Sequence, residues 1–341
     1  MIRFRVIWRA LLALSLVAAA LGGVATTVAN QESRVAAPPE QPVSGPGGRD
    51  ASFQDVVAEQ IGSDATGYWI FAPGDVSPKV KPLPLVLFFH GFSAVDPVVY
   101  RAWIDHIVRR GAVVVYPNYQ TLELNELNPD TYVPNALAAV EDAVDRLTRP
   151  RYPRVDLNNV AAVGHSVGGM LTANYAAVAG PLGLPVPLAI MPVQPGGCRG
   201  CDGAATGVPV AKLELVPATT LSLVVVGSDD TVVGESGARV IWAGTGQIPD
   251  ARRDYVEINS DDHGDPALSA DHFQASSDDM GGEVDALDWY GTWKLFDALM
   301  ACAFDGELCA TALGDTPEQR FMGTWSDGVP VEPMRITDGP T

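Results

Sequence analysis

Positive charge is scarce in this sequence. Its 341 residues include 22 Lys and Arg against 41 Asp and Glu, which gives a formal net charge of −19. An acidic surface repels nucleic acids and anionic membranes, so we expect no partner of either kind. Charged residues make up only 18% of the chain and hydrophobic residues 47%, which is not the composition of a disordered protein. The composition therefore predicts a folded domain with a large core.

No cysteine precedes Cys198, which excludes a lipid-modified N-terminal cysteine, and no adjacent Arg pair marks a twin-arginine export signal. Residues 1–29 nevertheless have the pattern of a signal peptide, in which three arginines precede an apolar stretch that ends in small residues. The alternative is an uncleaved membrane anchor, because about 20 apolar residues can span a bilayer. Both alternatives place the remaining chain outside the cytoplasm, secreted or anchored, and only the anchor would give a stable membrane partner.

Cysteine is also scarce, with four in the chain. An oxidising compartment favours disulfides, and proximity favours pairing Cys198 with Cys201 and Cys302 with Cys309, although the sequence allows three connectivities. The C-x-x-C spacing of the first pair also occurs in redox motifs and zinc sites. No second C-x-x-C or histidine pair completes a metal set, so we expect two local disulfides.

Internal repeats are absent, and the middle of the chain alternates short apolar runs with longer amphipathic ones. This alternation is typical of an α/β fold with a mainly parallel, doubly wound sheet and helices on both faces. We expect a Pro/Gly-rich linker at 30–50, a catalytic domain at 51–312 and a loosely packed or mobile tail at 313–341. The expected strands are 84–89, 112–116, 160–164, 186–191, 221–226 and 255–258, and the expected helices are 98–110, 132–147, 236–242 and 284–303.

The sharpest motif is Gly164-His165-Ser166-Val167-Gly168, followed by Gly169, at the point where an expected strand enters a helix. A serine on such a tight turn has its hydroxyl exposed above the sheet, and the flanking glycines avoid clashes. The amides at the start of the following helix favour negative charge that develops at the site. The pattern therefore predicts a nucleophilic serine at position 166.

This G-H-S-x-G-G sequence resembles the nucleophile elbow of the α/β-hydrolase superfamily, over roughly residues 84–303. Within that superfamily the chain is similar to secreted lipases, cutinase-like polyester hydrolases and chlorophyllases. The resemblance implies a serine esterase that forms an acyl-enzyme intermediate and needs neither a cofactor nor a metal. It also implies that the triad residues follow the order Ser, acid, His.

Two adjacent acids follow the expected strand 221–226. In similar hydrolases the acid often lies third after the glycine that ends this strand, here Gly227. This resemblance selects Asp230 as the triad acid and leaves Asp229 as the alternative.

Two histidines follow the expected strand 255–258. The resemblance places the base in the loop after this strand, which selects His263, while His272 lies nine residues further along and is the alternative. His106 lies in an amphipathic helix, where we expect a surface or boundary side chain, and His165 occupies the variable position of the elbow.

The tetrahedral intermediate of acyl transfer needs preorganised donors for its oxyanion. Residues 88–92, Phe-Phe-His-Gly-Phe, resemble the H-G loop that supplies them in similar hydrolases. The resemblance implies that the backbone amides of Phe92 and Val167 are the two donors. The His90 side chain would brace this loop without transferring protons.

The sequence leaves the substrate open. Residues 192–220 are too few for a large helical cap, so an open cleft suited to small or polymeric esters, such as lipids or polyesters, is expected. Residues 261–288 hold nine carboxylates and could bind calcium, but they lack EF-hand spacing, and we prefer simple solvation. The alternatives to an esterase are a peptidase or amidase with the same triad and a non-catalytic binding module on a hydrolase fold.

Overall fold

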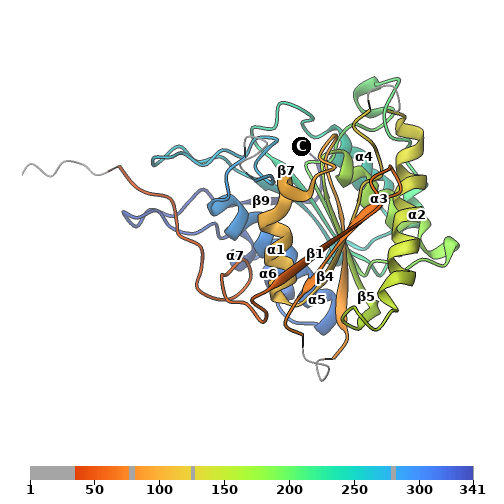
Figure 1. Cartoon of the computed structure of the whole chain (residues 1–341). Helices are drawn as coiled ribbons and strands as arrows, with labels where there is room; N and C mark the ends of the chain where they lie inside the picture. The colour runs from red at the N-terminus through yellow and green to blue at the C-terminus, as the bar shows by residue number, and fades with distance from the viewer. Residues whose placement is uncertain (1–34, 77–80, 124–126, 278–281, 341) are drawn as a thin grey trace, which may run out of the picture. The chain divides into compact units, whose positions relative to one another are not determined.

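The computed structural model describes residues 35–76, 81–123, 127–277 and 282–340 (Figure 1). The expected signal peptide, 1–29, lies outside the described residues. No helix in the described part of the chain combines the length and the apolar character needed to cross a bilayer.

The described strands form one nine-stranded sheet in the order β1-β2-β4-β3-β5-β6-β7-β8-β9. The six strands from β4 to β8 in this order run parallel, while β1, β2 and β9 run antiparallel to their neighbours. This confirms the predicted α/β class. The strands are β1 Val56–Ile61, β2 Tyr68–Pro73, β3 Leu83–Phe89, β4 Val113–Pro117, β5 Val155–His165, β6 Ala189–Val193, β7 Leu221–Gly227, β8 Arg253–Ile258 and β9 Arg335–Thr337.

Helices cover both faces of this sheet (Figure 1). Successive side chains along β3 point to opposite faces of the sheet, so this strand contributes to both cores. Val86 and Phe88 pack on the face that α1 and α5 cover. Leu85 and Leu87 pack on the face that α2, α3 and α4 cover. The helices are α1 Arg101–Arg110, α2 Pro129–Leu147, α3 Val167–Val178, α4 Ser236–Gly244, α5 Trp293–Asp305, α6 Cys309–Ala312 and α7 Pro317–Arg320.

Residues 35–50 form no helix or strand, but they pack on the body of the domain. The Gly47 amide donates a hydrogen bond of 2.8 Å to Oδ2 of Asp297, a buried carboxylate on α5. The same oxygen lies 2.8 Å from Nε2 of His106 and 3.1 Å from Nε of Arg110. His106 is therefore a buried partner of Asp297, and the expectation of a surface or boundary side chain is corrected.

The C-terminal segment is also packed, contrary to the expectation of a loose or mobile tail. Trp325 and Met334 are each 1% exposed, and β9 extends the sheet beside β8. Lys294 of α5 is buried and its ammonium donates to backbone carbonyls of this segment, including that of Gln319 at 2.9 Å. The scattered apolar residues of this segment therefore cover one end of the core.

Candidate active site

Ser166 lies at the sharp turn between β5 and α3, with φ 56° and ψ −122°. The glycines around it are required by close packing. A Cβ atom on Gly168 would lie 2.0 Å from the carbonyl oxygen of Phe89, and one on Gly164 would lie 2.3 Å from the carbonyl oxygen of Gly168. The elbow therefore brings α3 against the end of β3 and holds the serine in a conformation that is unfavourable for an L-residue.

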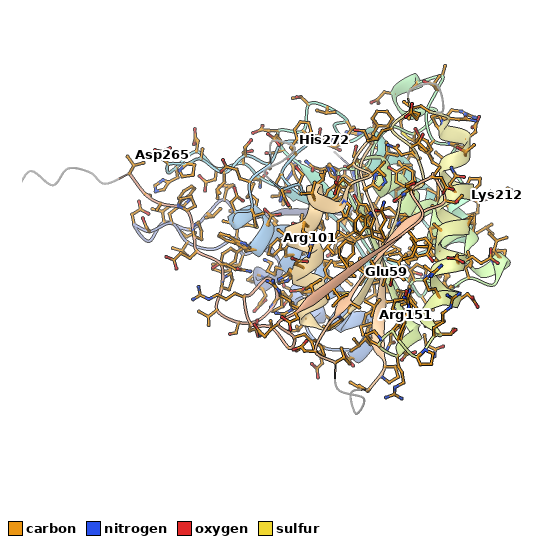
Figure 2. The ribbon with its side chains drawn as sticks, in the orientation of Figure 1. Glu59, Arg101, Arg151, Lys212, Asp265 and His272 are labelled. Carbon is orange, nitrogen blue, oxygen red and sulfur yellow. A yellow bond between two sulfur atoms is a disulfide. The ribbon has the colours of Figure 1, made fainter. Side chains whose placement is uncertain are left out.

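The structure brings Ser166, His272 and Asp230 together in one hydrogen-bonded chain. Nδ1 of His272 lies 2.8 Å from Oδ2 of Asp230, and its Nε2 lies 3.0 Å from Oγ of Ser166. A carboxylate can only accept, so Nδ1 carries the proton and Nε2 offers its lone pair to the serine hydroxyl. This is the arrangement by which an imidazole can take a proton from a serine. Figure 2 marks His272 in the connection that follows β8.

The Asp230 side chain is held in its charged form. Oδ1 accepts hydrogen bonds of 2.9 and 3.0 Å from the amides of Val232 and Val233. Burial raises the pKa of the carboxyl, but the hydrogen bonds from His272 and from these amides outweigh burial and lower the net pKa below its usual value. Asp229, the alternative acid, has an exposed side chain, and its amide donates to the carbonyl of Ala270 at 3.2 Å.

The predicted base, His263, is not placed with the serine, and this expectation is corrected. Its Nε2 lies 2.8 Å from Oδ2 of Asp327 in the C-terminal segment. The reason is an excursion of the chain between Asp261 and Leu268, which is closed by two backbone hydrogen bonds of 2.8 and 2.9 Å. Figure 2 shows Asp265 at the outer end of this excursion, well away from His272.

The signal that could have identified this excursion is present in the sequence. Gly264 and Pro266 flank Asp265 and mark a turn immediately after His263. The chain comes back to the sheet only after this turn, so the histidine nearer the strand in sequence is the farther one in space.

The loop after β3 lies beside Ser166. A Cβ atom on Gly91 would lie 3.5 Å from Cβ of Ser166 and 2.9 Å from the hydroxyl of Tyr100. The amide of Phe92 makes no hydrogen bond within the described residues, and that of Val167 is at the first position of α3, where no intrahelical acceptor exists. Both amides are thus available to a ligand.

His90 is buried beneath this loop. Its Nδ1 lies 2.6 Å from the carbonyl oxygen of Gly91, its Nε2 lies 2.7 Å from that of Asn118, and its ring stacks on Tyr119. Burial lowers the pKa of His90 to about 4. A neutral imidazole has one N–H, so it donates to one of these carbonyls at a time. These contacts support a bracing role for the side chain.

All four cysteines form disulfides, in the two local pairs expected: Cys198 with Cys201 and Cys302 with Cys309. Among the described residues, no group of three or more potential ligands could hold a metal ion. Two carboxylates of the loop considered for calcium, Asp278 and Asp279, lie outside those residues.

A family model described as alpha/beta hydrolase fold matches residues 86–219. That match and the sheet order decide the identification. The chain has the α/β-hydrolase fold. The matched region contains the loop after β3 and Ser166, but it ends before Asp230 and His272. No curated protein sequence matches the chain significantly. The position of Asp230 and His272 beside Ser166 therefore rests on the geometry alone.

Proposed function

We propose that this α/β hydrolase is a secreted serine esterase that cleaves carboxylic esters. The observation that carries the proposal is the hydrogen-bonded chain from Ser166 through His272 to Asp230 at the nucleophile elbow. The two disulfides support an oxidising compartment outside the cytoplasm.

In the proposed reaction, Oγ of Ser166 attacks the ester carbonyl carbon while Nε2 of His272 takes the hydroxyl proton. The tetrahedral oxyanion accepts hydrogen bonds from the amides of Phe92 and Val167. When the intermediate collapses, the C–O bond breaks and His272 gives its proton to the departing alcohol. Water then attacks the acyl-enzyme, with His272 as base, and releases the acid. Asp230 keeps the imidazole in the required tautomer throughout.

An apolar substrate is favoured by the surroundings of this site. Phe92, in the oxyanion loop, is 51% exposed, and Phe273, next to the base, is 37% exposed. Between β6 and β7 the chain forms only short turns, including Cys201–Gly203 and Leu213–Leu215, so this connection supplies no helical cap. An uncovered apolar approach suits lipid or polyester substrates.

The test is hydrolysis of p-nitrophenyl esters of graded chain length by the chain without residues 1–29, with Ser166→Ala as the matched control. We expect ester turnover that is lost in the control. Faster turnover of matched p-nitroanilides would favour the peptidase or amidase alternative. A folded wild type that neither turns over any substrate nor reacts with a fluorophosphonate would overturn the proposal in favour of a non-catalytic binding module.

A further inference from the structure

The segment that carries His272 is held by hydrogen bonds to three consecutive carbonyls. The carbonyl of Ala270 accepts a hydrogen bond from the Asp229 amide. The carbonyl of Asp271 accepts one of 2.5 Å from Nε2 of Gln194. The carbonyl of His272 accepts one of 2.8 Å from Nε2 of His165. Gln194 and His165 are both buried, and they follow β6 and end β5 respectively. The backbone of the base is thus fixed by side chains from the centre of the sheet.

The tautomer of His165 follows from its partners. A carbonyl can only accept, so Nε2 of His165 carries the proton that it donates to His272. Its Nδ1 lies 2.8 Å from the hydroxyl of Tyr100, which must donate to it. The same hydroxyl oxygen accepts from the Gly91 amide at 3.0 Å. A directed chain therefore runs from Gly91 through Tyr100 and His165 to the backbone of His272.

Neither side chain of this relay changes charge under ordinary conditions. Burial lowers the pKa of His165 to about 3 and raises that of the Tyr100 hydroxyl well above its usual range. Both residues are almost fully buried and do not contact the Ser166 hydroxyl through a described hydrogen bond. Their hydrogen bonds thus keep one direction while the enzyme works.

We propose that His165 and Tyr100 are positioning residues that tie the oxyanion loop to the base segment, so that the Phe92 amide and the His272 ring keep their places relative to Ser166. The relay reaches Gly91, which directly precedes Phe92, and the carbonyl of His272 itself. This inference rests on the proposed esterase function. A displacement of about 1 Å of the Phe92 amide or of the His272 ring is enough to slow the reaction strongly. It does so without weakening binding of the substrate in the ground state.

Replacing His165 by Gln or Asn tests its two hydrogen bonds separately. His165→Gln places an amide where Nε2 was and keeps a donor for His272, whereas His165→Asn places one where Nδ1 was and keeps an acceptor for Tyr100. His165→Leu removes both contacts, and Tyr100→Phe removes only the hydroxyl. His106→Asn is the matched control, because His106 is also a buried histidine but bonds to Asp297 on α5.

We expect kcat for a p-nitrophenyl ester to fall by about 10- to 100-fold in His165→Leu, with KM within about threefold of wild type. His165→Gln should recover part of this loss, and Tyr100→Phe should lower kcat while the base segment stays ordered. Amide hydrogen exchange of residues 270–273 should accelerate in His165→Leu and His165→Asn only. The control should lower the melting temperature and leave kcat unchanged.

Wild-type kcat in a folded His165→Leu or Tyr100→Phe variant would overturn the proposal. The proposal would also be overturned if His106→Asn lost as much kcat and as much melting temperature as the His165 and Tyr100 variants do. That result would indicate that the relay residues have a structural role alone. If wild type itself hydrolyses no ester, the proposed function fails. In that case, amide hydrogen exchange of residues 270–273 still tests whether His165 holds the segment that carries His272. An unchanged exchange rate in His165→Asn would overturn the proposal.

Discussion

Ser166 and Asp230 illustrate what the sequence predicts at the scale of single residues. Both follow directly from a strand whose apolar run ends in a glycine-containing turn, so their positions at the carboxyl edge of the sheet are local properties. The base is not predictable in this way. His272 reaches Ser166 through a long irregular connection, and its place depends on the closure between Asp261 and Leu268.

The choice between the two adjacent acids gives a residue-scale prediction. Asp230→Asn should lower kcat by about 10⁴-fold, because an amide at this position no longer selects the tautomer with a proton on Nδ1 of His272. Steady-state kinetics on one p-nitrophenyl ester is the measurement. Asp229→Asn is the matched control and should retain wild-type kcat, since its exposed side chain makes no hydrogen bond to His272 among the described residues. The reverse pattern would contradict the assignment of Asp230.

At the scale of elements, prediction worked for the parallel strands, although the apolar strand β2 was missed. The parallel strands β3 to β8 were all predicted, with bounds shifted by up to five residues, and β3, β4, β6 and β7 are mainly apolar and buried. The strands β1 and β2 were missed, as was the three-residue β9. β1 is half-exposed and contains Glu59 and Gln60, so it lacks the pattern of a buried strand. Its pairing with β2 is decided by tertiary contacts.

Packing of the C-terminal segment gives a prediction at this scale. Trp325→Ala should lower the free energy of unfolding by about 3–5 kcal/mol, because it removes a fully buried ring. The ring also donates a hydrogen bond of 2.9 Å from Nε1 to Asp261. The control, Phe321→Ala, truncates a ring that is 49% exposed and should cost less than about 1 kcal/mol. Urea denaturation measures both, and equal small losses would mean that this segment is loosely attached.

The pH dependence of stability belongs to the whole molecule, because buried groups in different parts of it act in opposite directions. The buried His90 and His165 have lowered pKa values, so the stability they contribute is complete above about pH 6.5 and is lost as the pH falls toward 4 and 3. Asp285 acts in the opposite sense, since burial raises its pKa to about 6. Its contribution is present at low pH and is lost as the pH rises through 6.

Asp285→Asn isolates one of these contributions. The neutral amide can still accept the hydrogen bond of 2.7 Å from the Leu287 amide, but it does not ionise. From pH 5 to pH 8, the wild type should lose about 1.4 kcal/mol of unfolding free energy more than the variant does. Comparing the two proteins at each pH cancels the histidine contributions. Parallel curves of unfolding free energy against pH would contradict the raised pKa.

The most direct test of the account compares two histidines of one loop in the same ester assay. His272→Ala should lower kcat/KM by about 10⁴-fold or more, because Ser166 loses the base that accepts its proton. His263→Ala removes contacts to Asp327 and to the Trp325 ring in the C-terminal segment, and it should leave kcat/KM at the wild-type value. Loss of activity in His263→Ala, with activity retained in His272→Ala, would contradict the proposed catalytic site.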